Sequence, residues 1–176
     1  MKNIFYGRFQ VETATALFRF QKHGITQEIL HNLKYRGQEQ ISHFFGAWLG
    51  HELAAHEAYN KVDLVIPVPI HKQKRRKRGY NQVTGFATEI AKALQIPCRE
   101  DILIKTSKTR SQVFKKRMGR FDTDEIFAIT DPTPLKNKHI LLVDDIVTTG
   151  ATLEHCANIL LDDTNAKISI ATIALA

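Results

Sequence analysis

The stretch L-L-V-D-D-I-V-T-T-G-A-T, residues 141–152, decides the fold. Together with the preceding isoleucine it opens on an apolar run, Ile140 to Val143, which predicts a buried strand ending at two adjacent carboxylates. We expect Ile146 to Gly150 to form a short loop. A helix should then run from Ala151 to Leu161, because its apolar residues share one face. A strand, a tight loop and a helix in succession are typical of α/β folds with parallel sheets.

The second half of the chain supports the same fold class. Short apolar runs rich in β-branched residues alternate with amphipathic stretches, which predicts strands alternating with helices. We therefore predict an α/β fold, with a parallel-sheet core over residues 61–176 that is flanked by helices within a single domain overall. The predicted strands are the apolar run from Val62, Ile102 to Ile104, Glu125 to Thr130, the run into Asp144, and Ile168 to Leu175.

Residues 1–60 are predicted to form a hairpin and helical segment that packs on this core. Phe5 to Phe20 alternates aromatic and polar residues, which indicates a short hairpin, and an amphipathic helix should follow and end at Gly37. The segments Lys72 to Arg78 and Lys105 to Arg120 are basic and without period, and both are expected to be loops. A second helix should carry an apolar stripe that we expect in the core: Ile41, Phe44, Phe45, Trp48, Leu49 and Leu53.

Two opposite chemistries lie side by side in residues 141–152. Hydroxyl side chains and a glycine at a helix start, with backbone N–H groups and the helix dipole, can receive a dianionic phosphate. The carboxylates of Asp144 and Asp145 repel a phosphate but can accept hydrogen bonds from vicinal hydroxyls, as on a ribose. Either piece alone could be a turn or a helix cap, but together they predict a site for a phosphorylated sugar. The hydroxyl donors would be Thr148, Thr149 and Thr152, and Gly150 would let the backbone approach the phosphate closely.

This stretch resembles the motif with which type I phosphoribosyltransferases bind phosphoribosyl pyrophosphate (PRPP). Three further segments, L-K-Y-R-G at 33–37, P-V-P at 67–69 and R-G-Y-N-Q at 78–82, are similar to the ComF competence-protein family. That family is a phosphoribosyltransferase-like group linked to DNA uptake, and the resemblance covers nearly the whole chain. It implies a type I phosphoribosyltransferase-like core under an N-terminal hood. By this resemblance, Asp144 and Asp145 would hold the ribose hydroxyls. The 5-phosphate would be held by the threonine-rich loop, residues Thr148, Thr149, Gly150, Ala151 and Thr152.

The resemblance also implies where pyrophosphate would bind. The turn after the first core strand and the basic run behind it would face this group; the residues are Pro69, Ile70, His71, Lys72 and Arg78. A mobile lid would lie in the second basic stretch, with Arg110 as its candidate catalytic residue and Gln112 beside it. The family's Arg-x-Asn pattern reads Arg120-Phe121-Asp122 here, so no role is assigned to Asp122.

No metal held by protein ligands is expected. His51 and His56 are five residues apart, which is not the helical spacing of a zinc hydrolase, and Cys98 and Cys156 are too far apart for a paired-cysteine site. Mg²⁺ would instead arrive on the pyrophosphate oxygens, because it commonly uses few protein ligands. ComF proteins usually begin with a four-cysteine zinc module. Whether its absence from these 176 residues is natural or a truncation stays open.

The net charge of +7 predicts anionic partners. Six of the seven residues from Lys72 to Arg78 are cations, more than one pyrophosphate needs. Two alternatives follow for the surplus charge: a contact with single-stranded DNA beside PRPP, or a solvated surface loop. The sequence has no apolar leader or spanning stretch, which predicts a cytoplasmic protein without membrane insertion. We expect an enzyme that transfers phosphoribose from PRPP to a nitrogen nucleophile and releases pyrophosphate. The alternative is a non-catalytic PRPP-binding or DNA-associated competence factor.

Overall fold

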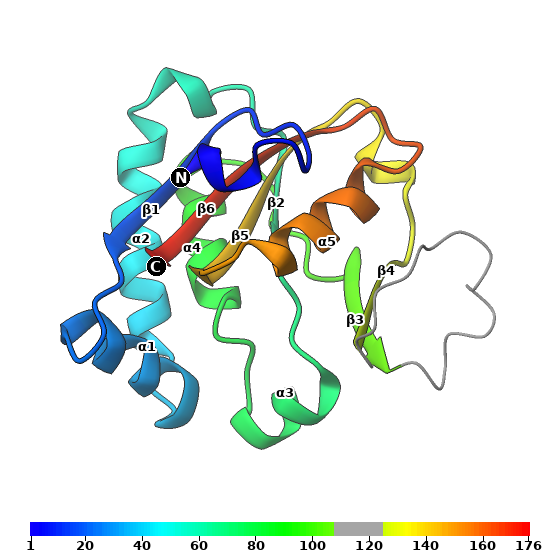
Figure 1. Cartoon of the computed structure of the whole chain (residues 1–176). Coiled ribbons are helices and arrows are strands. Elements are labelled where there is room, and N and C mark those ends of the chain that lie inside the picture. Colours follow the sequence, from blue (N-terminus) through cyan, green and yellow to red (C-terminus); the bar gives the residue numbers. More distant parts are fainter. Residues whose placement is uncertain (108–124) are drawn as a thin grey trace.

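The computed structural model describes residues 1–107 and 125–176, and four of its strands form one parallel sheet. The strand order in this sheet is β1-β6-β5-β2, and every neighbouring pair is parallel (Figure 1). Two further strands, β3 and β4, form a separate antiparallel pair. The α/β class predicted from the sequence is confirmed. The strands are β1 Ala14–Arg19, β2 Leu64–Pro67, β3 Leu103–Ser107, β4 Glu125–Ile129, β5 His139–Val147 and β6 Lys167–Leu175.

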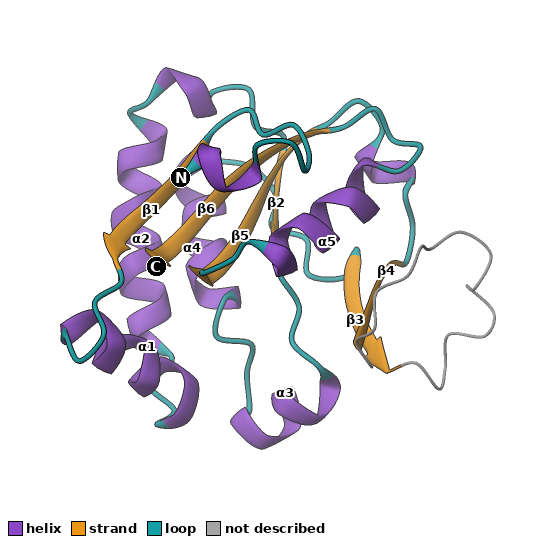
Figure 2. Cartoon of the chain, in the orientation of Figure 1, coloured by secondary structure: helices purple, strands orange, loops and turns teal. Residues whose placement is uncertain are grey.

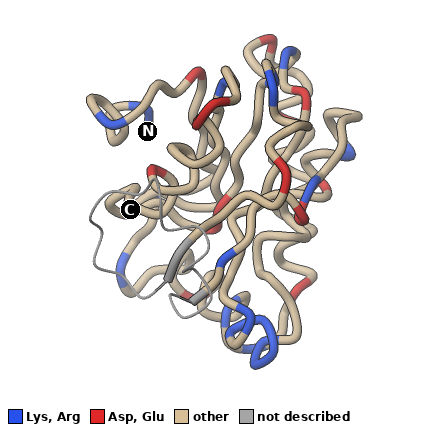
Figure 3. Tube along the Cα trace, turned by 90° about the vertical axis from the view of Figure 1, so that its right-hand side faces the viewer, with Lys and Arg blue, Asp and Glu red and all other residues tan. Residues whose placement is uncertain are grey.

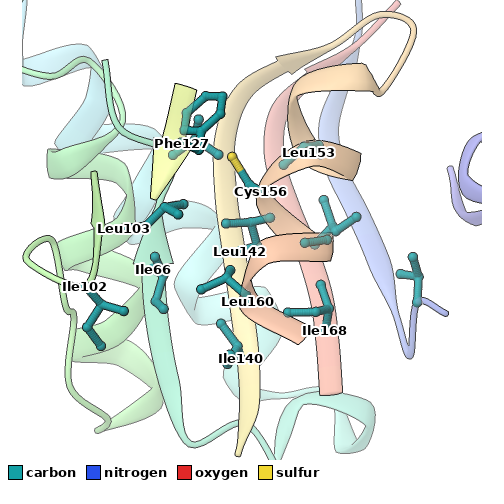
Figure 4. Packing of buried hydrophobic residues seen from close by; sticks show 14 of the residues in the cluster. Ile66, Ile102, Leu103, Phe127, Ile140, Leu142, Leu153, Cys156, Leu160 and Ile168 are labelled. Carbon is teal, nitrogen blue, oxygen red and sulfur yellow. The ribbon is translucent and has the colours of Figure 1, made fainter. Parts of the chain in front are cut away.

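Helices cover both faces of the parallel sheet, as Figure 2 shows. Alternate residues of β5 enter different clusters: Leu141 and Val143 pack with α2 and α4, whereas Ile140 and Leu142 pack with α5. The second of these clusters is drawn in Figure 4. Burial on both faces explains why β5 reads as a continuous apolar run. The helices are α1 Ile25–Tyr35, α2 Gln40–Ala54, α3 Lys72–Arg78, α4 Thr84–Leu94 and α5 Ala151–Leu161, with short 3₁₀ turns at Lys2–Phe5, Glu57–Tyr59 and Thr133–Leu135.

The predicted N-terminal hairpin over Phe5 to Phe20 is wrong. Only Ala14–Arg19 is extended, and it joins the main sheet in parallel with β6, from the pair Ala14↔Ile170 to the pair Arg19↔Leu175. The partner strand is more than 150 residues away, so no local turn signal could reveal the pairing. The sheet therefore takes in a strand from the first 60 residues.

The basic run at 72–78 is also not a loop. It forms α3, which begins where His71 Nδ1 accepts a hydrogen bond from the Gln73 backbone N–H at 3.3 Å. It ends at Gly79, whose φ of +86° is left-handed and suits a glycine at a helix end. Charged residues leave no apolar period in such a helix, so the sequence pattern could not predict it.

The aromatic stripe of α2 lies only partly in the core. Phe45, Leu49 and Leu53 are buried, but Phe44 is 63% exposed and Trp48 is 46% exposed. Trp48 contacts the ring of Phe18 from β1 edge-on, with 5.9 Å between ring centroids. Within the described ranges, no helix has the length and apolar character needed to cross a membrane.

Candidate phosphosugar site at the carboxyl edge of the sheet

The parallel strands end together at one edge, and the predicted site residues follow those ends. The turn from Pro69 to His71 comes after β2, residues 148–150 come after β5, and α1 comes soon after β1. In open α/β sheets this carboxyl edge is where ligands bind. The topology therefore gathers the singled-out motifs on one side of the molecule, the lower side in Figure 1.

The threonine-rich loop is shorter than predicted. β5 continues through both aspartates to Val147, because Ile146 and Val147 still pair with Ala174 and Leu175 of β6. The loop proper is residues 148–150, and α5 starts directly behind it. Its turn needs glycine: Gly150 has φ +78°, and a Cβ there would lie 2.9 Å from Cε1 of the Phe5 ring.

Arg8 anchors this loop from the N-terminal segment. Its Nη1 donates to the Thr149 carbonyl oxygen at 2.7 Å and pairs with Glu154 Oε2 of α5 at 3.2 Å. The Arg8 side chain thus links the loop, through the Thr149 carbonyl oxygen, to α5, through Glu154. Arg8 was not predicted as a site residue, because it lies in no recognisable motif.

Asp144 and the loop share one narrow pocket of about 40 Å³. The Asp144 side chain is half-buried, and its Oδ1 accepts the Asp145 backbone N–H at 2.8 Å. Burial first, and the neighbouring Asp145 charge second, raise the pKa of Asp144 to about 8. A protonated Asp144 can donate as well as accept a hydrogen bond, which suits a hydroxyl partner. The pocket is lined by Asp144, Ile146, Val147, Thr148, Thr149, Gly150, Ala151, Thr152 and Leu153.

Asp145 faces a different set of groups. It is only 4% exposed, and its Oδ2 accepts Gln82 Nε2 at 3.0 Å and lies 2.9 Å from Lys34 Nζ. The structure thus brings Asp144 to the threonine-rich loop, while Asp145 is held by α1 and by the segment before α4. Neither Lys34 nor Gln82 was predicted as a site residue, although both stand in the motifs L-K-Y-R-G and R-G-Y-N-Q.

The predicted pyrophosphate-facing residues lie at the same edge but outside the described lining of the narrow pocket. Pro69, Ile70 and His71 are half-buried, and Lys72 is exposed at the start of α3. Arg78 turns inward at the other end of α3, where Nη1 donates to Gln82 Oε1 at 2.6 Å. Arg110, Gln112 and Asp122 lie outside the described residues.

A larger open pocket of about 700 Å³ lies beside the narrow one, and Ile146 lines both. Its walls come mainly from α1 and the segment that leads into it, with Phe20, His31 and Tyr35 among the lining residues and Lys34 on the side of the aspartates. Over residues 1–107 and 125–176, no three His, Cys, Asp or Glu side chains gather in a way that could hold a metal ion.

Comparison with known proteins agrees with this geometry. The phosphoribosyl transferase domain family matches residues 84–176. Competence protein ComFC of Bacillus subtilis is 29% identical over 137 residues, covering 77% of this chain and 53% of that protein. Competence protein ComFC of Streptococcus pneumoniae is 30% identical over 134 residues, covering 76% and 56%. The DNA utilization protein YhgH of Escherichia coli O157:H7 is 25% identical over 146 residues, covering 81% and 63%.

Among solved structures, the adenine phosphoribosyl transferase of Trypanosoma brucei superposes with a TM-score of 0.51. That match covers 92% of this chain and 84% of the other at 10% identity, which supports the fold. The chain spans 53% to 63% of the length of the three curated relatives named above. The family match and these relatives confirm the resemblance seen in the sequence: this chain belongs to the phosphoribosyl transferase family, among the ComF competence proteins.

Proposed function

We propose that this chain binds PRPP at the carboxyl edge of the sheet and transfers its phosphoribose to a nitrogen nucleophile, releasing pyrophosphate. One observation carries the proposal: the Asp144 carboxyl and the loop of residues 148–152 line the same pocket. A hydroxyl-binding acid beside an amide-rich helix start matches the two ends of a 5-phosphoribosyl group.

In the proposed reaction, the bond from C1 of the ribose to pyrophosphate breaks and a bond from C1 to the acceptor nitrogen forms. Mg²⁺ carried on the pyrophosphate would neutralise the departing charge, and no cluster of protein ligands is required for it. Lys72, exposed at the start of α3, is a proposed pyrophosphate contact. The acids and the loop would hold the ribose and the 5-phosphate while this exchange occurs.

The larger pocket is the proposed place of the acceptor. It adjoins the narrow pocket through Ile146, so an acceptor there would approach the ribose from the side of α1. Aromatic and imidazole side chains on its wall, Phe20, His31 and Tyr35, favour a planar nitrogenous compound over a long aliphatic one.

Calorimetric titration with PRPP and Mg²⁺ tests binding, and release of pyrophosphate across a panel of bases, amines and ammonia tests transfer. We expect saturable binding with one site per chain and release that depends on one class of acceptor. Binding without release from any acceptor would favour the non-catalytic alternative, which the matches do not favour. Absence of binding would refute the proposal as a whole.

Single-stranded DNA is a proposed second partner. The exposed cations of α3, gathered at the lower end of Figure 3, support a sequence-independent contact with phosphates. The names of the relatives, competence protein and DNA utilization protein, support a role in DNA uptake. A cytoplasmic location, as predicted from the sequence, would agree with the use of PRPP.

A further inference from the structure

The Asp145 carboxylate is held by two donors that converge on one oxygen. Lys34 Nζ and Gln82 Nε2 both reach Oδ2, at 2.9 and 3.0 Å, from two elements that are far apart in sequence. A carboxylate that is 4% exposed needs such partners, because burying an unpaired charge is costly. Among the described residues, every hydrogen bond to this side chain ends on Oδ2.

The orientation of the Gln82 amide is fixed by its other end. Arg78 Nη1 donates to Gln82 Oε1 at 2.6 Å, and since guanidinium has no acceptor, the Gln82 NH₂ group must face Asp145. The chain of contacts therefore runs from the last residue of α3 through Gln82 to the acid pair.

The end of α1 and residues 78–82 are joined at two further points. The Arg78 guanidinium lies over the Tyr35 ring, 5.3 Å from its centroid, and the Tyr80 hydroxyl donates to the Leu33 carbonyl oxygen. The last turn of α1 and residues 78–82 are thus closed against each other around Asp145. These segments contain the two motifs L-K-Y-R-G and R-G-Y-N-Q, whose Lys34 and Gln82 have no other role in the proposed PRPP site.

Asp145 is also hydrogen-bonded to the acid that lines the narrow pocket. The Asp145 backbone N–H donates to Asp144 Oδ1 at 2.8 Å, so the residue whose carboxylate Lys34 and Gln82 hold is itself a partner of Asp144. Lys34 in addition places a positive charge close enough to lower the pKa of Asp144, against the effects of burial and of Asp145. One lysine thus acts on both carboxyl groups.

We infer that Lys34 and Gln82 are positioning residues of the proposed phosphoribose site, which hold Asp145, and through it Asp144, in the orientation that receives the ribose hydroxyls. The inference rests on the proposed function, and it gives α1 a role in ribose recognition beyond forming the wall of the larger pocket. A purely structural ion pair would stabilise the fold, and its loss would not weaken the binding of PRPP more than the binding of phosphate.

The experiment compares two probes on the whole chain, Mg²⁺–PRPP and inorganic phosphate, by calorimetric titration. Lys34→Met should weaken PRPP binding by about tenfold or more, because a charge-assisted contact to a buried acid is lost. Phosphate, which uses only the loop, should bind within about twofold of the unaltered protein. Lys34→Arg keeps the charge and should retain most of the PRPP affinity. Lys92→Met, which removes an exposed lysine of α4, is the matched control and should change neither probe.

A double-mutant cycle with Asp145→Asn tests whether Lys34 acts through Asp145. In the Asp145→Asn background, Lys34→Met should have little further effect on PRPP binding. Equal losses of PRPP and phosphate affinity, unchanged PRPP affinity, or additive effects in the cycle would each overturn the inference. If the unaltered protein bound phosphate but not PRPP, the proposed function would fail and the inference with it. If PRPP binding survived in full without Lys34, only the inference would fail.

Discussion

Gly46 of α2 lies so close to Phe86 of α4 that a Cβ on Gly46 would sit 2.6 Å from the Phe86 carbonyl oxygen. The contact is with backbone atoms, which cannot move aside without shifting α4. α2 and α4, which cover one face of the sheet, are therefore closely packed at this point. The Ser42 hydroxyl of α2 reinforces the contact, because it donates to Gln82 O at 2.8 Å and accepts the Phe86 backbone N–H at 2.7 Å.

Gly46→Ala should therefore destabilise the protein, although alanine is ordinarily the better helix former by about 1 kcal/mol. Overpacking typically costs about 1–3 kcal/mol, so after the gain in helix propensity we expect a net loss of up to about 2 kcal/mol in the free energy of unfolding. Thermal unfolding would show this as a melting temperature lower by a few degrees, roughly 2–4 °C per kcal/mol. The control is the exposed Ala47→Gly, which should lose only about 1 kcal/mol through helix propensity. A Gly46→Ala protein at least as stable as the unaltered one would contradict the close packing.

The pKa of Asp144 predicts how stability changes with pH. Its value of about 8 in the folded protein lies above the ordinary value of 3.8, so between these two pH values the folded state holds a proton that the unfolded state has released. Stability from this group is complete below pH 4 and is lost as the pH rises towards 8 and beyond. Asp144→Asn removes the titration, so the variant should gain stability relative to the unaltered protein as the pH is raised. Melting temperatures of both proteins at pH 5 and pH 8.5 measure this difference. A difference that stays constant with pH would show that Asp144 is ionised throughout.

Arg8 is predicted to set the affinity of the threonine-rich loop for a phosphate. Arg8→Ala removes the hydrogen bond to the Thr149 carbonyl oxygen, worth about 1 kcal/mol, which corresponds to roughly fivefold weaker binding of ribose 5-phosphate. Lys2→Ala is a suitable control, because Lys2 donates to the Glu12 carbonyl oxygen in the same N-terminal segment without contacting the loop. Equal affinities for ribose 5-phosphate in the two variants would show that Arg8 does not shape the loop.

The exposed middle of α3 should contribute to DNA binding and contribute little to PRPP binding. Replacing Arg75, Arg76 and Lys77 together by Gln should lower the salt slope of single-stranded DNA binding by about 2, at roughly 0.7 for each phosphate contact. PRPP affinity should stay within about twofold, because these side chains are exposed along the helix. A control that neutralises Lys22, Lys61 and Lys136 has the same net charge and should leave the slope nearly unchanged. An unaltered slope in the α3 variant would remove this helix from consideration as a DNA contact.

Much of the fold could be predicted because buried parallel strands have a visible pattern. β2, β5 and β6 are apolar runs, and the helices α4 and α5 have one apolar face, so each shows in its own residues. β1 could not be predicted in the same way, because its residues are only half-buried and show no continuous apolar run. Its place in the sheet depends on pairing with β6, which is distant in sequence. Phe44 and Trp48 fit the period of a core stripe, yet they stay largely exposed, which helical spacing alone does not reveal.

The site was predictable in its loop and less so in its electrostatics. Asp144 and residues 148–152 follow one another in sequence, so their shared pocket could be expected from the motif alone. Asp145 is bound by Lys34 and Gln82, which are both more than 60 positions away in the sequence. A motif can indicate that these segments matter, but it does not show which residues they contact. The continuation of β5 to Val147 likewise depends on hydrogen bonds to β6.

The pairing of the first strand with the last has a consequence during biosynthesis. As the nascent polypeptide leaves the ribosome, residues 14–19 emerge early, but in the finished sheet their neighbour is Lys167–Leu175 alone. The backbone groups of β1 that pair with β6 therefore have no partner strand while the intervening residues are translated. The sheet can be completed only after β6 has emerged. Closing so long a loop late favours slow assembly of the sheet.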